Sequence, residues 1–203
     1  MNDDGTALER WVPRGRPGYD RQSVLRVAVD VFNLHGYDAT SMGNVAEILG
    51  ISRSALYHHV ASKGELLKLA LDQALSMLED VFVQPEANHG TAAERLNFVV
   101  QQMVIVLVDQ LPAVTLLLRL RGNTTVERAA LNRRRAIEAE VVELVSLGRN
   151  EGSIRSDVDS RSAARLLIGL VNSIVDWYDP RNHPTPRQLA YEVFALAFGG
   201  LKP

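Results

Sequence analysis

The chain has 203 residues, of which 46% are hydrophobic and 23% charged, a balance typical of a globular protein that can bury a core. It contains no cysteine, which excludes disulfides, thiolate metal sites and a cysteine nucleophile, and this fits the reducing cytoplasm in which we expect the protein to act. The net charge of −2 provides no bulk attraction for a polyanion, so a nucleic-acid site must depend on where the charges lie.

No contact with a membrane is expected. The longest apolar stretch, residues 99–108, contains two glutamines and falls short of the roughly 20 apolar residues that span a bilayer. The first residues carry two aspartates and lack the pattern of a signal peptide.

Residues 1–19 combine glycines and prolines with few core-forming side chains, which predicts a flexible arm. Within it, the sequence PRGRP at 13–17 matches the core of an AT-hook, in which prolines keep the backbone extended. Arg14 and Arg16 could then enter a narrow, A·T-rich minor groove. The alternative is a tail that only aids solubility.

From Asp20 onward the apolar residues recur with a helical period. The first helix is expected to end at Gly36, and two short helices should follow, capped by Ser41 and Ser52. A capping box at residues 62–65 predicts a longer helix that reaches about residue 83. Further helices are expected at about 91–110, from 112, and at 124–149, 159–178 and 185–199.

The fold class is therefore all-α: a three-helix helix-turn-helix domain at residues 20–66, and a larger helical domain for effector binding and dimerisation at 67–203. Residues 41–60 have the features that a helix-turn-helix requires. Ala46 is small enough for close helix packing, Gly50 permits the turn, and Ile51 fills the interface. The second helix then projects polar side chains from its N-terminal end, which is the end that enters the major groove.

The segments FNLHGYDATSM and NVAEILGISRSALYHHVASKGELL closely resemble the DNA-binding domain of the TetR (AcrR-type) regulators, over about residues 20–70. The resemblance implies that Arg53, Ser54 and Ala55 read bases and that Tyr57, His58, His59 and Lys63 contact phosphates. Ser41 is also expected to contact the DNA. One departure is Val60, where the family usually has phenylalanine.

The chemistry of these residues agrees with the resemblance. Arg53 can donate two hydrogen bonds to the O6 and N7 atoms of guanine. Tyr57 and His58 can donate to phosphate oxygens, and Lys63 lies in the first turn of a helix, where free N–H groups attract anions. The alternative is that the histidines and Lys63 are ordinary surface groups. A metal site at His58 and His59 is disfavoured, because neighbouring helical residues point about 100° apart.

In the second half, LPAVTLLLRLRGNTTVERAALNRRR joins an apolar stretch to Arg119, Arg121 and Asn123. Arginines at the mouth of an apolar cavity suit an effector with an apolar body and an anionic group. The alternative is that Arg119 or Arg121 pairs with Glu94 or Glu127. Trp177 is a further candidate for the effector pocket, although it could equally be core.

The same stretch, with GLVNSIVDWYDP, resembles a branch of TetR regulators that control catabolic operons and respond to CoA thioesters. The resemblance implies a small-molecule effector of the acyl-CoA type. Arginines 133–135 could then meet the CoA phosphates, although a solvated helix face is the simpler interpretation.

The last two helices carry more apolar surface than one packing partner requires, which predicts a homodimer built on a four-helix interface. The residues proposed for that interface are Leu167, Leu170, Val171, Ile174, Leu189, Val193, Leu196 and Ala197. A homodimer would place two recognition helices about 34–36 Å apart, one turn of a double-stranded, palindromic operator.

The sequence thus predicts a transcriptional repressor that an effector releases from DNA. No enzyme is expected, because nucleophile triads, paired carboxylates, phosphate loops and metal-ligand spacings are not recognisable, and no cofactor is predicted. The alternative is a helical adaptor that binds a protein partner without sequence-specific DNA binding.

Overall fold

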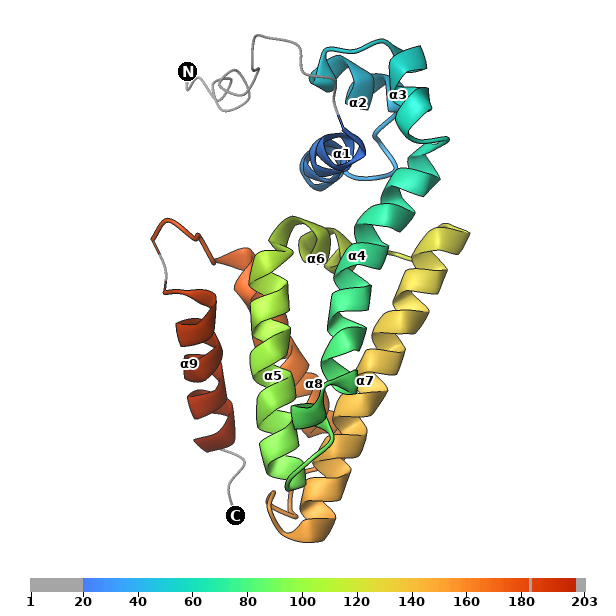
Figure 1. Ribbon diagram of the computed structural model, residues 1–203. Coiled ribbons are helices and arrows are strands. Elements are labelled where there is room, and N and C mark those ends of the chain that lie inside the picture. Colours follow the sequence, from blue (N-terminus) through green and yellow to red (C-terminus); the bar gives the residue numbers. More distant parts are fainter. Residues whose placement is uncertain (1–19, 183, 200–203) are drawn as a thin grey trace, which may run out of the picture.

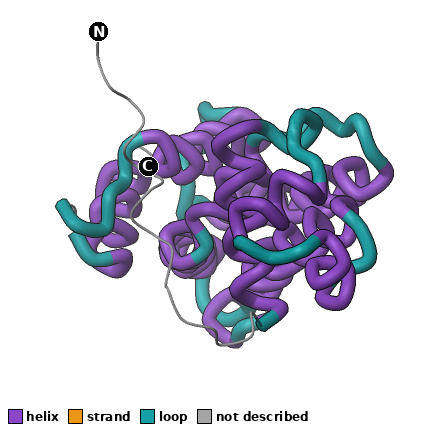
Figure 2. The backbone as a smooth tube through the Cα atoms, turned by 90° about the horizontal axis from the view of Figure 1, so that it is seen from above, coloured by secondary structure: helices purple, strands orange, loops and turns teal. Residues whose placement is uncertain are grey.

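A computed structural model describes residues 20–182 and 184–199. The predicted arm, with Arg14 and Arg16, lies outside the described residues. Every regular element within them is helical, which confirms the all-α prediction (Figure 1 and Figure 2). The elements are α1 (Arg21–His35), α2 (Met42–Leu49), α3 (Arg53–His59), α4 (Lys63–Val83), η1 (Pro85–Ala87), α5 (Ala92–Asp109), α6 (Leu111–Leu118), α7 (Thr125–Glu151), α8 (Ser160–Asn172), η2 (Ser173–Asp176) and α9 (Pro186–Gly199).

Helices α1 to α3 form a small domain at one end of the molecule (Figure 1). Each begins at a polar cap, as predicted for Ser41 and Ser52: the side chains of Asp20, Ser41 and Ser52 accept backbone N–H groups of the first turn. Gly50 ends α2 with φ 65°, a left-handed conformation that glycine adopts without steric cost, and so sets the turn into α3. Val60 is buried, so the smaller side chain at this position still joins the core.

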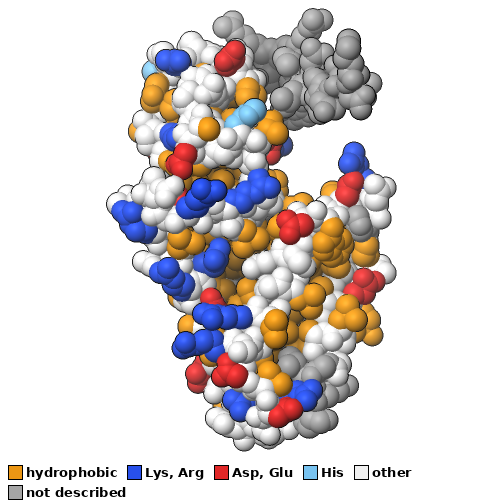
Figure 3. Space-filling model, turned by 180° about the vertical axis from the view of Figure 1, so that it is seen from behind, with side chains coloured by type: hydrophobic (Ala, Val, Ile, Leu, Met, Phe, Trp, Pro, Cys, Tyr) orange, Lys and Arg blue, Asp and Glu red, His pale blue; other side chains and the backbone are white. Residues whose placement is uncertain are grey.

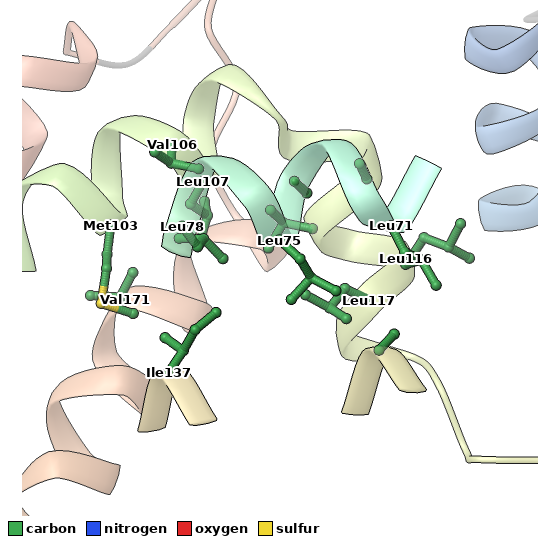
Figure 4. Packing of buried hydrophobic residues seen from close by; sticks show 14 of the residues in the cluster. Leu71, Leu75, Leu78, Met103, Val106, Leu107, Leu116, Leu117, Ile137 and Val171 are labelled. Atoms are coloured by element: carbon green, nitrogen blue, oxygen red, sulfur yellow. The ribbon is translucent and has the colours of Figure 1, made fainter. Parts of the chain in front are cut away.

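Helix α4 connects the two domains without a break over 21 residues. Leu66 and Leu67 are buried near its start, and Leu75 and Leu78 are buried in the body further along (Figure 4). The domain boundary predicted after residue 66 therefore lies inside one continuous helix.

The body is a bundle in which α5 packs on α9 and α7 packs on α4, α5 and α8. Its core is filled by apolar side chains from these helices and from α6, including Leu71, Met103, Leu117 and Ile137 (Figure 4). Helix α6 turns away from α5 by 102° and lies beneath the small domain, against α1 and α4 (Figure 1). Pro112 lies in the first turn of α6 as predicted.

Among the described residues, no single helix is long and apolar enough to cross a membrane. Only α5 and α6 taken together meet that criterion of length and composition, and they are sharply bent relative to each other.

Two local predictions were wrong. The helix expected to run to Tyr178 ends at Asn172 and continues as the 3-10 turn η2, in which the Trp177 N–H donates to the Ile174 carbonyl. In the predicted capping box at 62–65, Ser62 does accept the Glu65 N–H, but the Glu65 carboxylate accepts from the backbone of Ala61 (2.6 Å) instead of Ser62.

The apolar face predicted for dimerisation also needs correction. Leu167, Val171, Ile174, Leu189 and Val193 are buried within the protomer. The exposed large apolar residues of α8 and α9 are Leu166, Leu170, Tyr191 and Leu196. The helical stripe was recognised in the sequence, but most of it faces the protomer's own core.

Candidate DNA-binding surface and domain junction

Helix α3 presents most of the predicted DNA contacts on the outside of the small domain. Arg53, Ser54, Tyr57 and His58 are exposed, with 52% of Tyr57 accessible. Ala55 and His59 are half-buried. Leu56 is fully buried and anchors the helix to the domain core. The N-terminal half of α3 therefore offers a guanidinium and a hydroxyl side by side.

The Arg53 guanidinium lies against Gly43 of α2. A Cβ atom at Gly43 would come within 2.8 Å of the Arg53 Nε and 2.9 Å of its Cζ. Any larger residue at position 43 would therefore displace the Arg53 side chain. The contact of Gly43 with Arg53 was not predicted, because nothing in the spacing of the two residues indicates that they meet.

Ser41 is the cap of α2. Its hydroxyl donates to Asn44 Oδ1 (2.6 Å), and that same oxygen accepts the Ser41 backbone N–H (2.9 Å). Ser41 therefore has a structural role in starting α2, and its side chain remains exposed.

Lys63 has partners that the sequence did not predict. Its ammonium donates to the carbonyl oxygens of Tyr37 (2.8 Å), Thr40 (2.8 Å) and Asp38 (3.4 Å). It also lies 4.3 Å from the centre of the Tyr37 ring, within the range of a cation–π contact. An ammonium has three donors, so these carbonyls account for all of them. In this structure Lys63 ties the start of α4 to the turn between α1 and α2.

A hollow of about 530 Å³ lies where the small domain meets the body. One side is formed by the end of α1 and residues 36–39, and the other by the end of α6, residues 119–123 and Glu127. We call it the junction hollow. It brings together Arg119, Arg121 and Asn123, three of the four predicted effector residues.

Three hydrogen bonds connect the two domains around this hollow. Asn33 Nδ2 donates to the Pro112 carbonyl (2.8 Å), and Arg119 Nη1 donates to the Asn33 carbonyl (2.7 Å). Asn123 Nδ2 donates to Asp38 Oδ2 (3.0 Å). Asn33 and Asp38 were not among the predicted site residues. The one signal for Asn33 was a polar side chain directly beside the apolar stripe of α1.

The alternative that an effector arginine pairs with Glu127 is not observed. Glu127 is 3% exposed, and its carboxylate accepts the backbone N–H groups of Gly122 (2.9 Å), Arg121 (3.2 Å) and Asn123 (3.2 Å). Burial raises the pKa of Glu127, but these hydrogen bonds and one from Thr124 lower it below its usual 4.5 overall. The carboxylate therefore orders the loop that precedes α7. Glu94 caps α5 through Thr91.

Arg133 is also accounted for within the body. Its guanidinium forms ion pairs with Asp72 (2.8 Å) and Glu79 (2.6 Å) of α4.

Trp177 lies just after η2, is 47% exposed, and does not line the junction hollow. Seen from behind, Lys and Arg side chains gather along one side of the body below the small domain, whereas hydrophobic side chains are exposed over the other side (Figure 3). No cluster of potential metal ligands occurs among the described residues.

The arrangement agrees with comparisons to known proteins. Residues 24–70 match the family described as bacterial regulatory proteins, tetR family, and residues 89–201 match the tetracyclin repressor-like C-terminal domain. The chain belongs to the TetR family. It is a DNA-binding transcriptional repressor of this family, with a helix-turn-helix domain and an all-helical body.

Individual TetR relatives cover nearly the whole chain. SCO3833 from Streptomyces coelicolor A3, a member of the family, is 48% identical and superimposes with a TM-score of 0.84 over 89% of this chain and 91% of its own. The repressor KstR2 of Mycobacterium tuberculosis H37Rv is 26% identical over 92% of this chain and 95% of its own. The structure of AibR has the same fold, with 21% identity and a TM-score of 0.73 over 87% of this chain and 96% of its own.

Proposed function

We propose that this repressor binds a palindromic operator as a homodimer and is released from it by a CoA thioester. The observation that carries the DNA part is the exposure of Arg53, Ser54, Tyr57 and His58 on α3, in a helix anchored by the buried Leu56. A short capped helix with this surface can enter the major groove by its N-terminal end.

In this proposal the side chains divide into base contacts and backbone contacts. Arg53 binds guanine through two hydrogen bonds, and Ser54 and Ala55 meet neighbouring base edges. Phosphates are contacted by Tyr57, His58, His59 and Ser41, while Arg14 and Arg16 enter the adjacent minor groove. Lys63 acts indirectly, by fixing α4 to the turn that precedes α2.

The homodimer is proposed to form through α8 and α9. Their exposed leucines include Leu166 (72%) and Leu196 (75%), which a soluble monomer would leave in water. Pairing these helices with their symmetry mates would bury that surface in a four-helix interface.

The effector class rests on two observations. Arg119, Arg121 and Asn123 converge on the junction hollow, where guanidinium groups suit an anion. The solved structure of AibR contains isovaleryl coenzyme A together with operator DNA. A CoA thioester is therefore the ligand class we propose, and Trp177 is retained as a candidate contact for its acyl group.

The test begins with DNA fragments flanking the gene, titrated with full-length protein by fluorescence anisotropy at several salt concentrations. A specific operator complex should weaken steeply with salt, since several phosphates are neutralised. Arg53→Ala should lower discrimination at one position in each half-site by about 1–3 kcal/mol. A panel of CoA thioesters should then release the DNA. An affinity for DNA that depends on neither the salt concentration nor the DNA sequence would support the adaptor alternative instead.

A further inference from the structure

Asn33, which lines the junction hollow, carries a hydrogen-bond acceptor that the protein does not use within residues 20–182 and 184–199. Asn33 Oδ1 is buried and has no donor among the described residues. An acceptor left in this state destabilises a protein unless a ligand or water supplies a donor. The side-chain amide of Asn33 is meanwhile held in place by its bond to the Pro112 carbonyl.

Cations face the same space. Arg121 is exposed, lines the hollow, and forms no side-chain hydrogen bond or ion pair within the described part of the chain. Arg119 uses Nη1 for the Asn33 carbonyl and keeps its other guanidinium donors available. The acids nearby are already engaged: Glu127 by backbone N–H groups and Asp38 by Asn123.

We propose that the junction hollow is the effector site, shared between the DNA-binding domain and the body, and that it binds the phosphopantetheine part of a CoA thioester. This inference rests on the proposed function. The phosphates would pair with Arg119 and Arg121, because guanidinium donors match phosphate oxygens. Once the domains move apart and uncover this buried atom, a pantetheine amide or hydroxyl group would donate to Asn33 Oδ1.

The location of the hollow explains how ligand binding affects the position of the DNA-binding domain. A phosphate bound by the other guanidinium donors of Arg119 draws this group away from the Asn33 carbonyl, and a ligand beside Asn123 competes with Asp38. Both bonds tie the small domain to the body. Since the ligand favours the arrangement in which these bonds are open, it shifts the position of α1 relative to α6. By linkage, the form that binds DNA tightly binds the ligand weakly.

The experiment measures the affinity of the full-length protein for isovaleryl-CoA, free CoA and isovalerate by isothermal titration calorimetry. Wild type is compared with Arg121→Gln, which removes an exposed charge, and with Arg135→Gln. Arg135 is exposed on α7, where its side chain donates a hydrogen bond to Asn132, and belongs to the competing CoA site suggested by the sequence.

We expect both CoA compounds to bind, isovalerate not to bind, and Arg121→Gln to weaken CoA binding roughly tenfold or more. Asn33→Ala should weaken it as well, with thermal unfolding used to verify that this variant is folded. Equal affinities of wild type and Arg121→Gln, or a loss confined to Arg135→Gln, would overturn the junction hollow as the site, while CoA binding by wild type would still support a CoA thioester as the effector. Failure of both CoA compounds to bind wild type would overturn the ligand class in both proposals.

Discussion

The Lys63 ammonium lies 4.3 Å from the centre of the Tyr37 ring and donates to the carbonyl oxygen of the same residue at 2.8 Å. This contact joins the start of α4 to the turn after α1. It therefore fixes both ends of the segment that contains α2 and α3. Lys63 thus positions the proposed DNA-binding surface.

Lys63→Ala should lower the free energy of unfolding by about 1.5–3 kcal/mol, the range for hydrogen bonds to a charged group. Lys68→Ala is the matched control on α4, since Lys68 forms an exposed ion pair with Asp72 and should contribute below about 1 kcal/mol. Denaturant titration gives both values. The slope of operator affinity against salt should be the same for Lys63→Ala and wild type; a slope reduced by about one would assign Lys63 to a phosphate.

Gly43→Ala should affect the stability of the small domain and its discrimination between operator bases in opposite directions. Alanine is the better helix former by about 0.5–1 kcal/mol, so the domain should become as stable as wild type or more so. The added methyl group would displace the Arg53 guanidinium, and discrimination between operator bases should fall. Competition binding with single-base operator variants measures the loss. In an Arg53→Ala background the same substitution should leave base preference unchanged, and a further change there would mean that Gly43 acts by another route.

Leu196→Asp should disrupt the proposed dimer, because it places a charge where the exposed leucines of α8 and α9 would pack together. Sedimentation analysis should find a monomer, and affinity for a two-half-site operator should fall by at least tenfold. Val83→Asp is the control: Val83 is 76% exposed at the end of α4, away from that surface. If Leu196→Asp remained dimeric, the dimer interface would not be the one proposed on α8 and α9.

Glu127→Gln should destabilise the protein by about 1–3 kcal/mol at pH 7, because an amide cannot accept the loop N–H groups as strongly as a carboxylate does. The pKa of Glu127 is lowered in the folded state, so its stabilising contribution exists above the usual 4.5 and disappears as the pH falls through the lower folded value. Wild type and variant should therefore converge in acid. Unfolding curves recorded between pH 7 and 3 measure the difference in the free energy of unfolding between wild type and variant. Glu140→Gln, at an exposed position of α7, is the control.

Local signals predicted most of the fold. The caps at Ser41 and Ser52 and the turn glycine Gly50 start or stop helices within a few residues, so their effect can be predicted from short segments. The end of α8 was misjudged because η2 continues the same apolar stripe with tighter hydrogen bonding.

Contacts between distant segments could not be predicted in the same way. The bond between Asp38 and Asn123 joins residues 85 positions apart, and the partners of Lys63 are carbonyl groups, which every residue possesses. The sequence did single out Arg119, Arg121 and Asn123, which converge on one hollow. It could not reveal that the other wall of that hollow belongs to the DNA-binding domain.

The continuity of α4 has a mechanical consequence. With a rise of 1.5 Å per residue its 21 residues span about 30 Å, so each degree of rotation about one end carries the other end through roughly 0.5 Å. In a two-fold symmetric assembly the α3 helices of both protomers move, and the spacing between them changes by up to twice that amount. A pivot of only a few degrees is therefore enough to bring the pair out of register with one turn of the double helix.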